Sequence, residues 1–191
     1  MRPEVIAIGA SAGGVEALKH ILQGLKKPSH LSVLVVLHIP AESPSLLTSI
    51  YQDICQFHVK EAEPGEELLP ETVYIAPPNY HLSAEANKTL SLSTEDPVNY
   101  SRPSIDILMD SVAVALGEKG CGILLTGANH DGAAGMARIN KNGGLTIIQD
   151  PAEALYPQMP QSCLLLFEPD FILSLRDIEQ RLTFFSGATN G

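Results

Sequence analysis

The stretch VIAIGASAGG (residues 5–14) decides the fold. It begins with four apolar residues (5–8), and a short continuous apolar run of this kind predicts a β-strand that is buried on both faces. The glycines that follow permit a sharp turn. From about Ala12 to Leu25 the apolar side chains recur with helical spacing, which predicts an amphipathic helix. A buried strand, a glycine turn and a helix in this order indicate an α/β chain.

The same alternation continues along the chain. Further strands are predicted at 31–37, 73–76, 122–125, 145–148 and about 171–173, and further helices at 44–55, 103–116, 133–140, about 158–166 and 176–185. The segment 81–93 alternates apolar and polar residues around a central Asn-Lys pair, which predicts a hairpin. We therefore expect one domain, 1–191, with an α/β fold. Its sheet should be doubly wound and mostly parallel, with helices on both faces and a small antiparallel hairpin.

Composition and charge exclude several classes of protein. The chain has 191 residues, of which 45% are apolar, and its formal net charge is -10. The field of such a chain repels nucleic acid and anionic lipid. No apolar run approaches the roughly 20 residues that span a bilayer. The three cysteines form no CxxC pair, so we predict buried thiols, no metal site and a cytoplasmic protein.

Three polar residues follow three of the predicted strands. Ser11 comes three residues after the first strand, His38 directly follows the second, and Asp131 comes a short turn after the strand at 122–125. The carboxyl ends of parallel strands lie at one edge of a sheet, where ligands bind in folds of this kind. A nucleophile, a base and an acid that meet at one edge form the arrangement that acyl transfer needs.

The chemistry accounts for each residue type. A serine hydroxyl is a weak nucleophile, so His38 would take its proton, and Asp131 would orient the imidazole. The N–H of Ala12, at the expected start of the first helix, would stabilise an oxyanion, with a second donor from the turn at 127–129. Taken singly, Ser11 and Asp131 are explained as helix caps and His38 as a hydrogen-bonded residue at a strand end. Three unrelated residues rarely supply this combination at one edge.

Two other interpretations of the glycine turn fit less well. A dinucleotide site needs the spacing GxGxxG and an acidic residue after the second strand, whereas this turn reads GASAGG and the second strand is followed by His38. The α/β-hydrolases share the pattern GxSxG, but their triad runs in the order serine, acid, histidine. The order here is serine, histidine, acid.

Six segments of the chain resemble the catalytic domain of the chemotaxis protein-glutamate methylesterases, the CheB-type enzymes. The resemblance covers nearly the whole chain in order. The matching segments are IGASAGG (8–14), VVLHIP (35–40), YIAPPNYHL (74–82), SRPSIDILMDSVA (101–113), LTGANHDGAAGM (125–136) and QDPAEALYPQMPQ (149–161).

The resemblance implies an activity and roles for individual residues. It places the nucleophile on Ser11, the base on His38, the acid on Asp131 and a backbone oxyanion donor on Ala128. It implies hydrolysis of glutamate methyl esters in the cytoplasmic helices of methylated chemoreceptors, with deamidation of glutamine as a related reaction. No cofactor and no metal are implied. Alternatives are a serine esterase for another small ester and a non-catalytic interaction domain.

The chain departs from the family at a few positions. The family usually has Met-Gly where this chain has Ala128 and Asn129, and many members carry a hydroxyl residue at the position of Ala12. His130 is unusual beside Asp131, and we expect it to be a solvated loop residue. Chemotaxis members also carry an N-terminal receiver domain, whereas this sequence begins at the first catalytic strand. We therefore expect either a stand-alone enzyme or a part of a larger protein, and in both cases a domain that is active without phosphorylation. Any control would come from a separate regulatory protein, from substrate localisation or from a larger parent chain.

Overall fold

Parallel strands form the centre of the molecule. The computed structural model describes residues 2–38 and 46–187, and within them seven strands form one sheet in the order β3-β4-β2-β1-β7-β8-β9, with every neighbouring pair parallel. These strands are β1 (Val5–Ala10), β2 (Ser32–Leu37), β3 (His58–Glu61), β4 (Thr72–Ile75), β7 (Gly120–Leu124), β8 (Leu145–Gln149) and β9 (Phe171–Leu173). A separate antiparallel hairpin consists of β5 (His81–Ala84) and β6 (Leu90–Ser93). The predicted mostly parallel sheet and small hairpin are confirmed.

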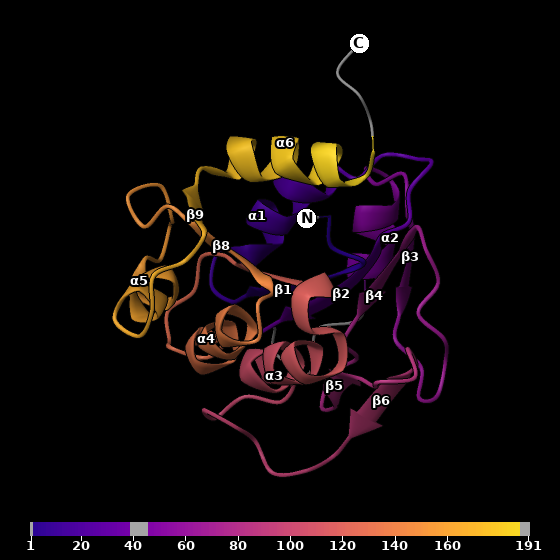
Figure 1. The fold of residues 1–191 in the computed structure, drawn as a ribbon, viewed down its shortest axis with the longest axis horizontal. Helices are drawn as coiled ribbons and strands as arrows, with labels where there is room; N and C mark the ends of the chain where they lie inside the picture. Colours follow the sequence, from indigo (N-terminus) through magenta and orange to yellow (C-terminus); the bar gives the residue numbers. More distant parts are fainter. Residues whose placement is uncertain (1, 39–45, 188–191) are drawn as a thin grey trace.

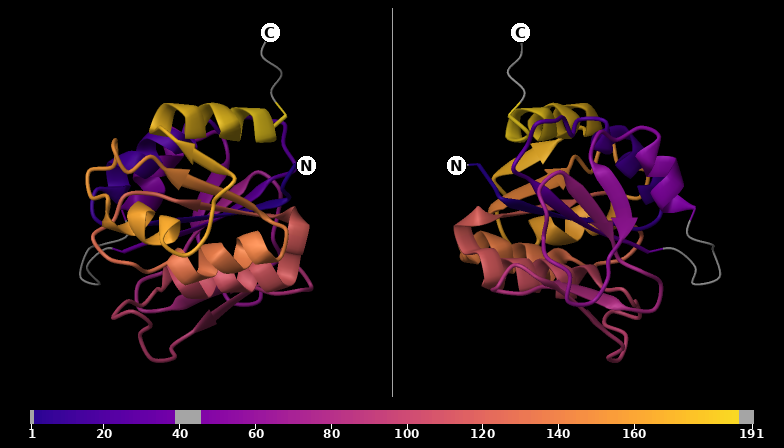
Figure 2. Two further views of the ribbon diagram at one scale, coloured as in Figure 1. Left: turned by 60° about the vertical axis from the view of Figure 1, so that its left-hand side comes forward. Right: turned by 90° about the vertical axis from the view of Figure 1, so that its right-hand side faces the viewer.

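Helices cover both faces of the sheet (Figures 1 and 2). One face is covered by α1 (Gly14–Leu22), α2 (Leu47–Gln52) and α6 (Leu175–Phe185). The other is covered by α3 (Ile105–Leu116), α4 (Ala133–Lys141) and α5 (Gln158–Leu164), with the hairpin packed against α3. A short 3-10 turn, η1 (Gly117–Lys119), leads from α3 into β7. The fold is therefore doubly wound, as the sequence predicts.

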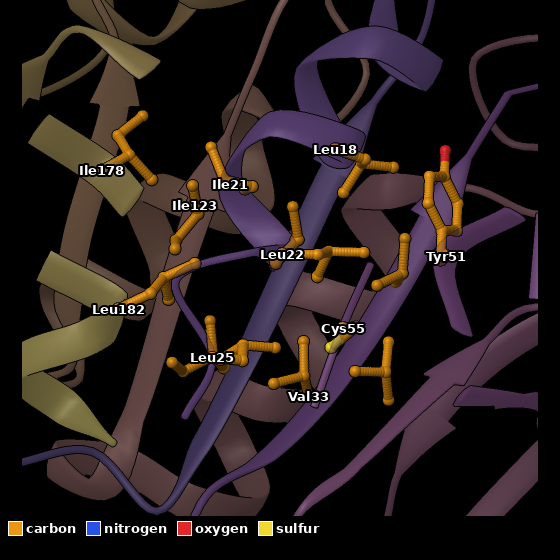
Figure 3. Close-up of a cluster of buried hydrophobic side chains, with 14 of the residues drawn as sticks. Leu18, Ile21, Leu22, Leu25, Val33, Tyr51, Cys55, Ile123, Ile178 and Leu182 are labelled. Carbon is orange, nitrogen blue, oxygen red and sulfur yellow. The ribbon is translucent and has the colours of Figure 1, made fainter. Parts of the chain in front are cut away.

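The apolar sequence of β1 follows from its place in the middle of the sheet. All six of its residues are buried, with Ile6 and Ile8 in the core on the α1 side and Val5 and Ala7 in the core on the α3 side. A central parallel strand has no solvated face, so it needs apolar side chains at every position. Figure 3 shows the first core, where side chains of α1 and α6 meet those of the strands.

The chain changes direction in the sheet at β1. It passes from β1 to β2 on one side, while β7 pairs with the other side of β1. The turns after these three strands leave the sheet at the same edge, which is the switch point where open α/β sheets bind their ligands.

Several predicted elements differ from the observed ones by a few residues at their ends, most of all the first two helices. The first helix begins at Gly14 and not near Ala12, because Gly13 adopts a left-handed φ of 78° as its N-cap. The helix predicted at 44–55 is shorter in the structure, where α2 covers six residues; residues 44 and 45 lie outside the described part.

Strand β3 was not predicted from the sequence. It is a short edge strand that pairs only with β4 among the described strands. Of its four residues only Val59 is buried, so its sequence carries neither a continuous apolar run nor a clear alternation.

Candidate active site

Hydrogen bonds join the ends of β1, β2 and β7. The N–H of Ser11 donates to the carbonyl of Thr126 at 3.0 Å, and the N–H of His38 donates to the carbonyl of Ala10 at 3.0 Å. The Thr126 hydroxyl donates to the carbonyl of Ala12, also at 3.0 Å. The backbone on both sides of Ser11 is thus fixed by its neighbours in the sheet.

Ser11 and His38 lie side by side at this edge. They follow Ala10 and Leu37, the last paired residues of β1 and β2. Neighbouring strands are about 4.8 Å apart, so residues at these positions are close enough for their side chains to meet. Both side chains are partly buried. Within the described part of the chain the Ser11 hydroxyl makes no hydrogen bond, which leaves it available to react.

The turn after Ser11 requires glycine. Gly13 has a left-handed φ of 78°. At Gly14 a Cβ atom would lie 2.6 Å from Cδ1 of Leu37 and 2.7 Å from Cβ of Ala10, which is closer than carbon atoms can approach. Any side chain at these positions would displace the turn that carries Ser11.

The structure corrects the expected setting of Ala12. We expected its N–H to belong to the first turn of the helix, but α1 begins two residues later, at Gly14. Ala12 therefore lies in the preceding turn, and the helix end is not what orients it. Its N–H makes no hydrogen bond within the described residues and remains available to an oxyanion.

His38 and Asp131 are in contact. Nε2 of His38 lies 3.0 Å from Oδ2 of Asp131, and the carboxylate is fully buried. The N–H at Nε2 does not point at Oδ2 of Asp131. The two atoms are therefore close enough for an ion pair, but the angle is poor for a hydrogen bond. Catalytic hydrogen bonds are often poorly aligned until the substrate binds. Since Nε2 faces the acid, Nδ1 is the ring nitrogen on the far side from it, where the side-chain amide of Asn129 lies 3.5 Å away.

The N-terminus of α3 holds the Asp131 carboxylate. Oδ2 accepts the N–H of Ile105 at 2.7 Å, and Oδ1 accepts the N–H of Asp106 at 3.1 Å. Oδ1 also accepts the hydroxyl of Ser104 at 2.9 Å and the side-chain amide of Asn99 at 3.0 Å. Free N–H groups and the helix dipole both favour negative charge at this position. The acid is therefore held rigidly in its charged form.

These contacts decide the ionisation of Asp131. Burial by itself would raise the pKa of this carboxyl, but the nearby His38 ring and the hydrogen bonds from Asn99, Ile105 and Asp106 outweigh it. The pKa of Asp131 consequently lies below its ordinary value. The carboxylate stays charged at neutral pH, as an acid that orients a histidine must.

The lowered pKa of Asp131 makes folding stability depend on pH. The folded state binds this proton less tightly than the unfolded chain, so the stabilisation is present above the ordinary pKa of about 4 and is lost as the pH falls through the lower folded value. We expect the wild type to exceed Asp131→Asn in free energy of unfolding at pH 7, and the difference to shrink below pH 4. Urea titrations at pH 7 and pH 3 measure it. An equal difference at both values would contradict this assignment.

The turn after β7 contains a second backbone N–H without a hydrogen-bond partner among the described residues. The N–H of Gly127 is bonded to the carbonyl of Tyr156 at 3.0 Å, but the N–H of Ala128 makes no hydrogen bond within the described residues. Ala128 is exposed at the same edge as Ser11. His130 is exposed as well, as expected for a solvated loop residue.

Asn129 has a role that the sequence did not suggest. Asn129 does not adopt a positive φ, so its backbone conformation does not require glycine. It differs from the glycine that is usual in the family by the contacts of its side chain. Oδ1 accepts the N–H of Asp131 at 3.1 Å, and Nδ2 lies 3.5 Å from Nδ1 of His38. The amide therefore links the turn to the histidine.

Asn99 and Ser104 were missed as site residues in the sequence. Ser104 belongs to the segment SRPSID, whose resemblance to the methylesterases indicated that it matters but assigned it no function. Its hydroxyl accepts the Ile107 N–H as the N-cap of α3 and donates to Asp131. Asn99 lies in the loop before α3, and no pattern in the sequence pointed to it.

The described residues contain no obvious site for a metal ion, since no group of three or more His, Cys, Asp or Glu side chains is arranged to hold one. None of the described helices combines the length and apolar character that crossing a bilayer demands.

Comparison with known proteins identifies relatives over nearly the whole chain. The model of the CheB methylesterase family matches residues 6–182. A Leptospira interrogans protein named for protein-glutamate methylesterase and protein-glutamine glutaminase activity is 43% identical over 180 residues, which cover 94% of this chain and 93% of the relative. An enzyme of the same name from Pectobacterium atrosepticum is 38% identical over 182 residues, or 94% of this chain and 52% of that protein.

A solved structure has the same fold. The crystal structure of the Thermotoga maritima CheB methylesterase catalytic domain superposes with a TM-score of 0.90 at 31% sequence identity. The match covers 96% of this chain and 99% of that domain. The arrangement of strands and helices is thus shared along almost the full length of both chains.

Proposed function

The chain belongs to the CheB methylesterase family, and from this premise we propose that it hydrolyses glutamate methyl esters in chemoreceptor proteins. Ser11 is the nucleophile, His38 the base and Asp131 the orienting acid. The observation that supports these roles best is the 3.0 Å contact between His38 and the buried Asp131 carboxylate, beside a serine hydroxyl that is free of other hydrogen bonds. If the contact between His38 and Asp131 only stabilised the fold, there would be no need for an unbonded serine hydroxyl at the end of the neighbouring strand.

Acylation begins when Oγ of Ser11 attacks the carbonyl carbon of the ester. Nδ1 of His38 exchanges its 3.5 Å contact with the Asn129 amide for the serine hydroxyl and accepts the hydroxyl proton. Asp131 stabilises the imidazolium that forms. The oxyanion accepts hydrogen bonds from the N–H groups of Ala12 and Ala128. The tetrahedral intermediate then collapses, the histidine returns its proton to the leaving oxygen, and methanol departs from an acyl-enzyme.

Deacylation repeats the same proton transfers with water. His38 takes a proton from the water that attacks the acyl carbon, and the collapse of the second intermediate returns that proton to Oγ of Ser11. The glutamate side chain leaves as a carboxylate, with the remaining proton released to solvent. One ester and one water thus yield one carboxylate, one methanol and one proton, and no step uses a metal or a nucleotide.

Deamidation of glutamine is a second reaction of the same site. An amide differs from the ester only in its leaving group, which departs as ammonia after taking the proton from His38. The curated relatives are named for both activities. Both reactions would form the same acyl-enzyme on Ser11.

The purified protein should release methanol from a methylated receptor fragment and ammonia from its unprocessed glutamine form. A fluorophosphonate should label Ser11 and abolish both activities, because both depend on the same hydroxyl. Labelling without hydrolysis of the receptor fragment would favour an esterase for another small ester. A protein that is neither labelled nor active would favour a non-catalytic interaction domain.

Activity is expected without a phosphodonor. Turnover should be the same with and without acetyl phosphate, because the proposed site uses only residues of this domain. A strong stimulation of the purified chain would contradict this.

A further inference from the structure

Two large side chains, Tyr100 and Leu155, are exposed on loops that contact the candidate active site, the first loop at Asp131 and the second at the turn after Ser11. Tyr100 is in the loop between β6 and α3, and it is fully exposed. Leu155 is in the loop after β8, and 73% of its surface is exposed. The two loops lie on the same side of the molecule (Figure 2, left view).

Tyr100 occupies a position that suits glycine better. Val98 and Ser101 form two backbone hydrogen bonds, of 3.1 and 2.9 Å, around a two-residue turn. Both turn residues have positive φ, 49° at Asn99 and 63° at Tyr100. Such turns favour Asn followed by Gly, and an aromatic side chain with this φ is uncommon. The exposed aromatic ring of Tyr100 is thus carried on a backbone conformation that is strained for a residue other than glycine.

The turn is fixed to the catalytic acid. The side-chain amide of Asn99 donates to Oδ1 of Asp131 at 3.0 Å and to Oδ2 of Asp106 at 2.8 Å. Tyr100 is the next residue, so its backbone position is tied to the triad. Its exposed ring is therefore at a fixed place beside the site and not at the tip of a free loop.

Leu155 marks the other side, at the nucleophile turn. Gly13 lies two residues after Ser11, and a Cβ atom there would be 3.2 Å from Cδ2 of Leu155. The leucine side chain therefore rests directly on the turn that carries the nucleophile. The next residue, Tyr156, is also exposed, and its N–H donates a hydrogen bond to the Thr126 hydroxyl oxygen at 2.9 Å.

We propose that Tyr100 and Leu155 determine specificity for a protein substrate by packing against the polypeptide on either side of the esterified glutamate. This inference rests on the proposed function and refines it. The reacting ester must lie within reach of Ser11, whereas a polypeptide that carries it must extend beyond the site in both directions. The Leu155 side chain and the aromatic ring of Tyr100 would contribute there mainly by burial of apolar surface. A small free ester would not reach them.

The test compares a methylated receptor fragment with N-acetyl-glutamate γ-methyl ester, a small substrate with the same reacting group. Tyr100→Gly, Leu155→Ser and the double variant are assayed on both. Each single change should lower kcat/KM for the receptor fragment by about 10-fold, mainly through KM, because it removes the burial of one apolar side chain. Values for the small ester should stay within about twofold.

Two controls separate binding from folding. Tyr100→Gly should unfold at the same temperature as the wild type or slightly above it, because glycine adopts the positive φ without strain. A stability defect therefore cannot explain weaker binding by this variant. Leu69→Ser is the control for loss of an exposed leucine. The Leu69 carbonyl accepts a hydrogen bond from the hydroxyl of Ser32, the first residue of β2, so Leu69 lies at the end of the sheet opposite the site. It should leave both substrates unaffected.

The outcomes distinguish this inference from the proposed function. Equal losses on both substrates would mean that the two residues act on the chemistry, and unchanged values on both would mean that they contact no substrate; either result overturns the inference alone. A wild type that hydrolyses the small ester but not the receptor fragment would overturn the proposed function as well.

Discussion

Replacing Ser11 by alanine is expected to lower kcat for methanol release by about 10⁴-fold or more. The change removes the atom that forms the acyl-enzyme, and the Ser104 hydroxyl, which also contacts Asp131, is buried and donates its proton to that carboxylate. The fold should persist, since the turn is held by backbone bonds of Ser11 and not by its hydroxyl. Methanol release from a methylated receptor fragment measures the loss, and circular dichroism checks the fold.

His38→Ala should cost about as much, and the double variant Ser11→Ala/His38→Ala should cost little more than either single change. Residues that act as one catalytic unit are far from additive, because the loss of any member already prevents formation of the acyl-enzyme. Near-normal turnover by Ser11→Ala would contradict the triad. Two single losses that multiply in the double variant would mean that the residues act independently.

Asp131→Asn is expected to lower kcat by about 10³-fold, somewhat less than the loss of Ser11, because the nucleophile and the base both remain. Three donors, from Asn99, Ser104 and Asp106, converge on Oδ1, so the amide oxygen would take that side. The amide nitrogen would then face the N–H of Ile105 and Nε2 of His38. The amide N–H groups would point at the N–H groups of Ile105 and His38, which are also donors. The neutral amide would no longer stabilise the charged histidine. The same methanol assay measures this loss.

Asp131→Ala should also destabilise the fold, by about 3–5 kcal/mol. It removes the acceptor from buried donors at the N-terminus of α3 and leaves them without partners. The matched control is Asp110→Ala on the same helix, whose carboxylate pairs with Arg138 at 3.1 Å on an exposed surface. The control should cost less than about 1 kcal/mol. Similar losses in the two variants, measured by urea unfolding, would show that Asp131 is not held as described.

The fold could be predicted because its determinants are local. Continuous apolar runs, such as those in β1 and β2, identify strands that are buried on both faces. Glycine turns show approximately where helices begin. Strand β3 escaped prediction because an edge strand needs only one buried side chain, and one residue makes no pattern. The start of α1 was misplaced because it depends on the backbone angle of Gly13, which composition does not reveal.

The sequence by itself determined the parallel sheet apart from its edge strand β3, the winding of that sheet, and the three residues at its carboxyl edge, because the turns after parallel strands lie at one edge. Only the tertiary structure decided what surrounds them. The donors to Asp131 come from residues 25 to 32 positions away along the chain. Whether those donors point at the carboxylate depends on how α3 packs on the sheet, because a hydrogen bond requires both distance and direction. The exposed rim at Tyr100 and Leu155 arises in the same way, from loops that the packing of separate elements brings to one edge.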